Sequence, residues 1–342
     1  HRGILPGKQH SIIGTGLGRP VMRLHAGLEQ EGERCFHAPC PVRSWGIFTA
    51  HCPALGRRFT HGLGVKKHGH IRQRFGEISV NQKPADPSLN LEFVDEALNL
   101  VRDADAKGIR LRILGSVAYR LQCPNNLHLF QDTKRALTDV DFGAEKKQNR
   151  AIRDFLTARG YVPDEGIYMA SEGARHAYLH RGTGLNVDVF ADELYFCHRI
   201  PFKGRLDLDS PTICTTDLLL EKMQIVEINL KDFKDTIVLM LEHPLSHEQP
   251  GLKSIDINYI VDIMRQDWGF YYTFTTNLKR VPDYIDQFSS LGEEGRRVIR
   301  GRIDGLLAAI ESAPKTFGWK MRSKIGTRSR WYQEVSEKSQ QY

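Results

Sequence analysis

The residues best suited to chemistry are two aspartates that alternate with apolar residues. Asp139-Val-Asp141 is followed by Phe142, in the alternating pattern of a β-strand. Because side chains i and i+2 of a strand point to the same face, the two carboxylates are expected to meet at one point. Two like charges that close are costly unless a cation lies between them, and such oxygen ligands suit Mg²⁺ or Mn²⁺. We therefore expect Asp139 and Asp141 to bind a metal ion. The alternative is a solvated strand end.

A third aspartate lies in a second segment with the pattern of a strand. Asp188 stands at the centre of residues 185–190, with a valine on each side. An acid surrounded by apolar residues needs a partner, and Asp139 and Asp141 with their metal would provide one. Asp188 is therefore expected to be the third carboxylate of the site.

A turn of small residues comes earlier in the chain. Gly115-Ser116 follows residues 109–114, which alternate apolar and basic side chains as a strand does, and precedes residues 117–121, which can begin a helix. Glycine permits a tight turn and a close backbone approach. A serine hydroxyl and the first N–H groups of a helix can hold a phosphate. The alternative is an ordinary turn.

The surrounding elements predict an α+β fold. Helices are expected at 88–108 and 147–159, and strands at 109–114, 139–142, 176–180 and 185–190. Further helices are expected at 217–226, 230–242, 256–264, 282–290 and 293–312. We expect a small mixed β-sheet core flanked by helices in residues 86–212, followed by a mostly helical region in residues 213–342.

Residues 1–85 have a different composition. They hold 13 of the 48 Lys and Arg residues but only 4 of the 41 Asp and Glu residues, so the remainder of the chain is close to neutral. They show no helical or strand period, which predicts a disordered or non-native basic extension. The alternative is a basic arm that contacts nucleic acid. A zinc site from Cys35, Cys40, His51 and Cys52 is conceivable, although the spacing matches no common zinc module.

The composition also bears on location. The sequence contains no run of about 18 apolar residues, and its beginning has no secretory pattern. None of the six cysteines forms a CxxC pair. We therefore expect free thiols, a cytoplasmic location and no membrane partner.

The order of these motifs resembles the nucleotidyltransferase superfamily that includes DNA polymerase beta. That family has a Gly-Ser or Gly-Gly turn, a DxD or DxE strand and a third acid on a neighbouring strand. The likeness is greatest to the abortive-infection type of nucleotidyltransferase toxin and its uncharacterised bacterial relatives. Those add a helix with a lysine, which matches Lys222, and a K/R-D-x-x-D helix, which matches Lys231-Asp232-Phe-Lys-Asp235. The resemblance covers about residues 90–245.

The resemblance implies a nucleotidyltransferase fold and transfer of a nucleoside monophosphate from an NTP to an acceptor hydroxyl. Asp139, Asp141 and Asp188 would be the catalytic, metal-binding residues, and two Mg²⁺ or Mn²⁺ ions would bridge the first pair, one of them shared with Asp188. Gly115, Ser116 and Lys222 would bind the nucleotide. The acceptor would be a tRNA end, a protein or a small molecule, and an antitoxin-like protein would be a partner.

One departure from the family pattern and several alternatives remain open. Gly115 and Asp139 are 24 positions apart, longer than is usual in the family, which puts contact between Ser116 and the nucleotide in doubt. Lys222 has the alternative of facing solvent on an amphipathic helix. The DxD also suits a glycosyltransferase that holds a nucleotide sugar, and the fold suits a non-catalytic nucleotide-binding or interaction protein. A haloacid-dehalogenase-type phosphatase is disfavoured because Phe142-Gly143 follows the second aspartate.

Overall fold

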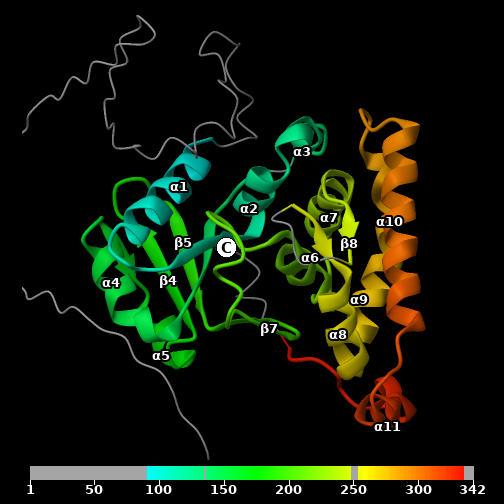
Figure 1. The fold of residues 1–342 in the computed structure, drawn as a ribbon. Helices are drawn as coiled ribbons and strands as arrows, with labels where there is room; N and C mark the ends of the chain where they lie inside the picture. Colours follow the sequence, from blue (N-terminus) through cyan, green and yellow to red (C-terminus); the bar gives the residue numbers. More distant parts are fainter. Residues whose placement is uncertain (1–90, 135, 248–252, 335–342) are drawn as a thin grey trace, which may run out of the picture. The chain divides into compact units, whose positions relative to one another are not determined.

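The computed structural model describes residues 91–134, 136–247 and 253–334 (Figure 1). All of them belong to one compact unit. The predicted basic extension, residues 1–85, lies outside the described residues, and so do the four conceivable zinc ligands.

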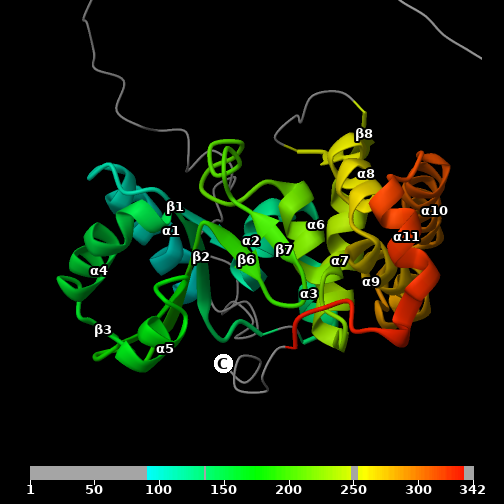
Figure 2. The ribbon, with the colours of Figure 1, turned by 90° about the horizontal axis from the view of Figure 1, so that it is seen from below.

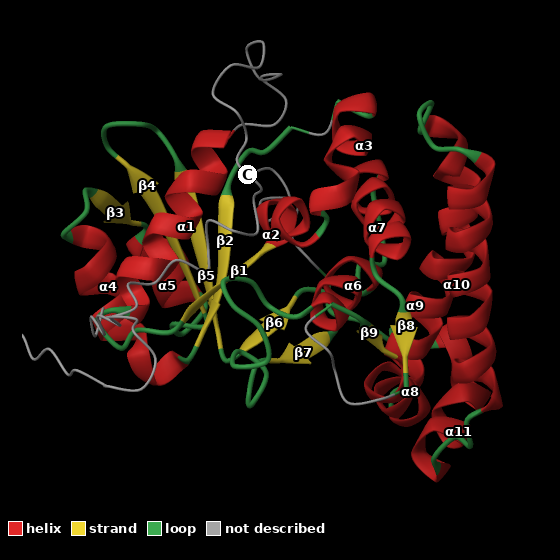
Figure 3. Ribbon diagram, turned by 45° about the horizontal axis from the view of Figure 1, so that its top comes forward, coloured by secondary structure: helices red, strands yellow, loops and turns green. Residues whose placement is uncertain are grey.

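A mixed sheet lies in the first half of the described chain, as predicted, and it has five strands. Its strands run in the order β1 (Leu111–Leu114), β2 (Val140–Ala144), β5 (Asn186–Ala191), β4 (Arg175–His180) and β3 (Tyr161–Pro163), of which β3 was not expected. The central strand β5 and its neighbour β2 are parallel, and every other neighbouring pair is antiparallel. Parallel pairing joins two segments far apart in the sequence at the centre of the sheet (Figure 3).

Helices flank this sheet. α1 (Leu91–Asp105) contacts β1, α2 (Gly115–Gln122) contacts β2, α4 (Asn149–Thr157) contacts β3, and α5 (Glu165–Ala170) contacts β4. α1 buries Val94, Ala97, Leu100 and Val101, which recur at helical spacing and join the apolar core. The turn after α1 ends in Gly108, whose φ of +70° suits glycine.

The long segment between Gly115 and Asp139 is largely folded. It contains the remainder of α2, a 3-10 turn (Pro124–Asn126) and the short helix α3 (Leu127–Asp132). α3 buries Leu129 and Phe130 and contacts α7 (Leu230–Glu242). The segment is therefore packed against the helical region.

The second half of the described chain is mostly helical, also as predicted. Its α-helices are α6 (Thr215–Met223), α7, α8 (Ile257–Gln266), α9 (Trp268–Arg280), α10 (Glu293–Ser312) and α11 (Phe317–Ile325). α9 and α11 were not expected, and the helix expected at 282–290 is a 3-10 segment, Val281–Gln287. The chain after α11 returns to the hairpin of β6 (Glu193–Tyr195) and β7 (Arg199–Pro201), where the Gln333 N–H donates to the Cys197 carbonyl at 3.1 Å (Figure 2).

None of the helices in the described ranges combines the length and the apolar character that a membrane span requires.

Candidate active site

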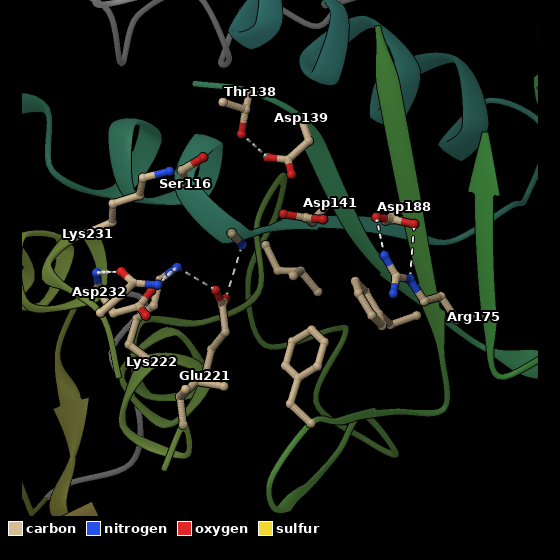
Figure 4. A pocket seen from close by; sticks show the side chains of 16 residues that line it. Ser116, Thr138, Asp139, Asp141, Arg175, Asp188, Glu221, Lys222, Lys231 and Asp232 are labelled. Atoms are coloured by element: carbon tan, nitrogen blue, oxygen red, sulfur yellow. Dashed lines mark hydrogen bonds and ion pairs between the residues drawn. The ribbon is translucent and has the colours of Figure 1, made fainter. Parts of the chain in front are cut away.

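The three predicted carboxylates lie at the centre of the sheet. Asp141 of β2 and Asp188 of β5 are directly paired in the parallel register, so their side chains leave the same face of the sheet. Asp139 immediately precedes β2 and lies two residues from Asp141, on that same face. All three line one pocket (Figure 4).

Gly115 lies directly against Asp141. Its φ is +67°, and a Cβ added there would lie 2.2 Å from Asp141 Oδ2. Only glycine fits, because a side chain would both strain the backbone and overlap the carboxylate. The glycine of the predicted turn is therefore required at this position by close approach to the DxD strand.

Ser116 lines the same pocket, at the beginning of α2. The long spacing between Gly115 and Asp139 does not separate the turn from the carboxylates, because the intervening residues pack against α7. The predicted nucleotide-binding residues Gly115, Ser116 and Lys222 thus share one pocket with the three aspartates. The pocket takes residues from both sides of the predicted boundary at residue 212.

Arg175 is the partner of Asp188. From β4 its Nε donates to Oδ1 at 3.2 Å, and its Nη2 donates to Oδ2 at 2.8 Å. This two-pronged contact is the strongest geometry for a guanidinium and a carboxylate. Burial lowers the pKa of Arg175, but the hydrogen bonds to Asp188 and the negative charges of Asp188, Asp141 and Asp139 outweigh it and raise the pKa. Asp188 is therefore neutralised from the neighbouring strand.

Asp141 lies in an electrostatically unfavourable position. Burial raises its pKa well above the ordinary value, and the charges of Asp139, Asp188 and Glu221 raise it further, with Lys222 opposing them. A divalent cation placed among these carboxylates would reverse the penalty.

Lys222 is buried and surrounded by acids. Its Nζ lies 3.2 Å from Glu221, 3.3 Å from Asp232 and 3.6 Å from Asp235. The alternative of a solvent-facing lysine is therefore wrong, because α6 packs on every side and all nine of its residues are buried. The predicted contact with nucleotide phosphates stays a prediction, although Lys222 does line the pocket.

Glu221 connects this cluster to the glycine turn. Its Oε2 accepts a hydrogen bond of 3.1 Å from the Gly115 N–H, and its Oε1 pairs with Lys222. Burial raises the pKa of Glu221, while Lys222 and the Gly115 N–H lower it. Glu221 therefore holds the turn and the lysine in a fixed relation.

The first turn of α7 forms one wall of the pocket. Asn229 caps this helix by accepting from the Asp232 N–H at 3.1 Å. Lys231 is exposed, lines the pocket and extends toward Ser116 (Figure 4). A helix N-terminus with an exposed lysine favours anions on this side.

Asp139 and Asp141 fit a divalent cation better than Asp188 does. Asp139 and Asp141 offer two carboxylates on one strand face, which suits Mg²⁺. In the described part of the chain, however, no group of three or more His, Cys, Asp and Glu side chains is arranged to hold a metal. Arg175 engages both oxygens of Asp188, which leaves Asp139 and Asp141 as the two carboxylates available to a cation.

Several pocket residues were not identified as site residues from the sequence, and Thr138, Arg175 and Glu221 are three of them that contact other pocket residues. Thr138 donates to Asp139 at 3.1 Å. Arg175 could be found only through the β4–β5 register, which pairs Ala177 with Asp188 and leaves Arg175 diagonally adjacent. The signal at Glu221 is two adjacent charges, Glu221 and Lys222, in an otherwise apolar stretch of helix.

Comparisons with protein-family models, with curated proteins and with solved structures found no match to this chain. The geometry of the pocket is therefore the basis for assigning a function.

Proposed function

We propose that this chain is a metal-dependent nucleotidyltransferase that moves a nucleoside monophosphate from an NTP to an acceptor hydroxyl. The observation that carries the proposal is the in-register pairing of Asp141 with Asp188, together with the glycine turn lying against Asp141. A lone DxD is common. A DxD facing a third carboxylate and a glycine turn in one pocket is specific.

The reaction is an in-line displacement at the α-phosphorus. The acceptor oxygen forms a bond to the α-phosphorus. The bond between the α-phosphorus and the α,β-bridging oxygen breaks. The electron pair leaves with pyrophosphate, and the hydroxyl proton is released to solvent. Mg²⁺ or Mn²⁺, when bound, would neutralise charge on the triphosphate.

The chain's own residues would divide this work by position. Asp139 and Asp141 would hold the cation. Gly115, Ser116 and Lys222 would bind the nucleotide, and the exposed Lys231 would add a positive charge for the triphosphate. Asp188 would face the acceptor. Catalysis of this kind consists mostly of positioning and charge neutralisation.

The acceptor is a tRNA end, a protein or a small molecule in this proposal. A cytoplasmic location and an antitoxin-like protein partner belong to it as well. They rest only on the resemblance of the motifs to the abortive-infection nucleotidyltransferases.

The test is incubation of the purified chain with each α-labelled NTP, Mg²⁺ and a cell extract separated into RNA, protein and small-molecule fractions. We expect label in one fraction, and loss of that label in Asp141→Asn. Asp207→Asn is the matched control, because Asp207 is an exposed aspartate paired with Arg110 outside the pocket. Absence of label from all four NTPs with either Mg²⁺ or Mn²⁺ would overturn the proposal.

The same assay separates the two alternatives. Transfer from nucleotide sugars instead of NTPs would favour the DxD glycosyltransferase, and nucleotide binding without transfer would favour a non-catalytic protein. The described residues before Asp139 form α1, β1, α2 and α3, less than the α/β half-domain that would precede the DxD of such a glycosyltransferase. This comparison favours the nucleotidyltransferase.

A further inference from the structure

The pairing of Arg175 with Asp188 has a consequence for the number of metal ions. Both carboxylate oxygens of Asp188 accept hydrogen bonds from the guanidinium, at 3.2 and 2.8 Å. The side chains are 19% and 9% exposed, respectively. A metal ligand on this carboxylate would compete with a charge-assisted, two-pronged contact that water weakens little.

Arg175 is also held in place by its surroundings. It lies on β4, and β4 is paired along its length with β5, which carries Asp188. Its guanidinium lies over the Phe190 ring, 5.5 Å from the centroid. A guanidinium presents a planar fork that matches a carboxylate. The pair is therefore built into the register of the sheet, whereas a surface pair could separate freely.

Asp139 and Asp141 have different partners. Asp139 accepts a hydrogen bond from the neutral hydroxyl of Thr138. The charges of Asp139, Asp188 and Glu221 act on the Asp141 carboxylate, with Lys222 opposing them. Asp139 and Asp141 thus offer two carboxylates on one strand face to a divalent cation, while both oxygens of Asp188 already accept hydrogen bonds from Arg175.

We propose that this site binds a single divalent cation, at Asp139 and Asp141, and that Arg175 takes the place of a second ion beside Asp188. The inference rests on the proposed function, because the cation is counted together with a bound nucleotide. Arg175 would be a positioning residue that keeps Asp188 in place and neutralised on the acceptor side. The two-ion arrangement implied by the resemblance would be reduced to one ion and one guanidinium.

The experiment is equilibrium dialysis of the full chain against Mn²⁺ and α,β-methylene analogues of the four NTPs. Mn²⁺ and analogue bound by the protein are measured as the difference between the two chambers, so complexes free in solution cancel. We expect one Mn²⁺ per bound analogue for the wild type. Arg175→Met, which removes the charge and frees Asp188, is expected to bind two.

Two further variants control for charge and for folding. Arg175→Lys keeps a positive charge beside Asp188 and is expected to bind one Mn²⁺. Arg199→Met removes an exposed arginine that pairs with Glu193 outside the pocket, and it is also expected to bind one. Circular dichroism checks that each variant is folded. If Arg175→Met does not fold, Arg175→Gln, which keeps a polar side chain without the charge, takes its place and is also expected to bind two.

The outcomes separate this inference from the proposed function. Two Mn²⁺ per analogue in the wild type would overturn the inference and leave the function standing. One Mn²⁺ in both the wild type and a folded Arg175→Met would also overturn it, because the guanidinium would not be what excludes the second ion. Failure of every analogue to bind would overturn the proposed function and the inference with it.

Discussion

Replacing Gly115 by alanine should damage the site more than it damages the fold. The glycine has a φ of +67°, and the added Cβ would lie 2.2 Å from Asp141 Oδ2 and 3.1 Å from its Cγ. Cβ atoms essentially never lie within 3.0 Å of another group. The alanine must therefore displace the Asp141 carboxylate, the turn or both.

The magnitude has two parts. A non-glycine residue at positive φ costs about 1–2 kcal/mol. Moving the Asp141 side chain away from its preferred rotamer costs roughly 1 kcal/mol more. We expect the free energy of unfolding to fall by about 2–3 kcal/mol. Because a displacement of about 1 Å at a reacting site can cost about 100-fold in rate, nucleotidyl transfer should fall by at least that factor.

Gly108→Ala is the matched control. Gly108 has a φ of +70°, and an added Cβ would meet nothing within 4 Å. It shares the backbone penalty, about 1–2 kcal/mol, without the overlap. Urea unfolding measures the stability of both variants, and transfer of an α-labelled nucleotide measures activity. Equal activity in Gly115→Ala and Gly108→Ala would refute the placement of Asp141 against the glycine turn.

Three further predictions concern buried charge. Burial and the charges of Asp139 and Asp188 raise the pKa of Asp141, so the metal-free protein loses stability as pH rises through that pKa. In EDTA at pH 7, Asp141→Asn should therefore unfold at a higher urea concentration than the wild type, and a lower one would contradict this. Lys222→Met leaves three buried carboxylates without their positively charged partner, so the free energy of unfolding should fall by about 3–5 kcal/mol. Lys279→Met, at an exposed position, should lower it by at most about 0.5 kcal/mol. Equal losses in the two variants would show that Lys222 is not buried. Burial lowers the pKa of His198 to about 4. Between pH 6.5 and 4 the free energy of unfolding of the wild type should therefore fall by about 3 kcal/mol more than that of His198→Gln. An equal fall for both proteins in urea unfolding would refute this.

The alternation of side chains along a strand explains why part of the site was predictable from the sequence. The i, i+2 rule was enough to place Asp139 and Asp141 on one face, and β2 confirms the strand. The register of β2 with β5 is a different matter, because nothing in the spacing of two distant segments determines which residues pair across a parallel ladder. For this reason Asp188 was a hypothesis, and Arg175 was not singled out.

The helical region shows the same limit. α7 was predicted at its observed bounds because its apolar residues recur at helical spacing. α9 was missed because its sequence, WGFYYTFTTNLKR, is rich in aromatic and β-branched residues that favour strands. Packing overrides that preference, since eight of its residues are buried among the neighbouring helices. The buried cluster around Lys222 was missed for a related reason, because burial on every side of α6 leaves no amphipathic pattern.

The central claim is nucleotidyl transfer by the carboxylate pocket, and the fate of the label tests it most directly. Two parallel reactions contain the chain, Mg²⁺ and the cell-extract fraction that accepted label in the first assay. One reaction carries an α-labelled NTP and the other a γ-labelled NTP. We predict that the α-label joins the acceptor, that the γ-label leaves as pyrophosphate, and that Asp141→Asn does neither. Label on the acceptor from the γ-position, or undiminished transfer by Asp141→Asn, would contradict the account.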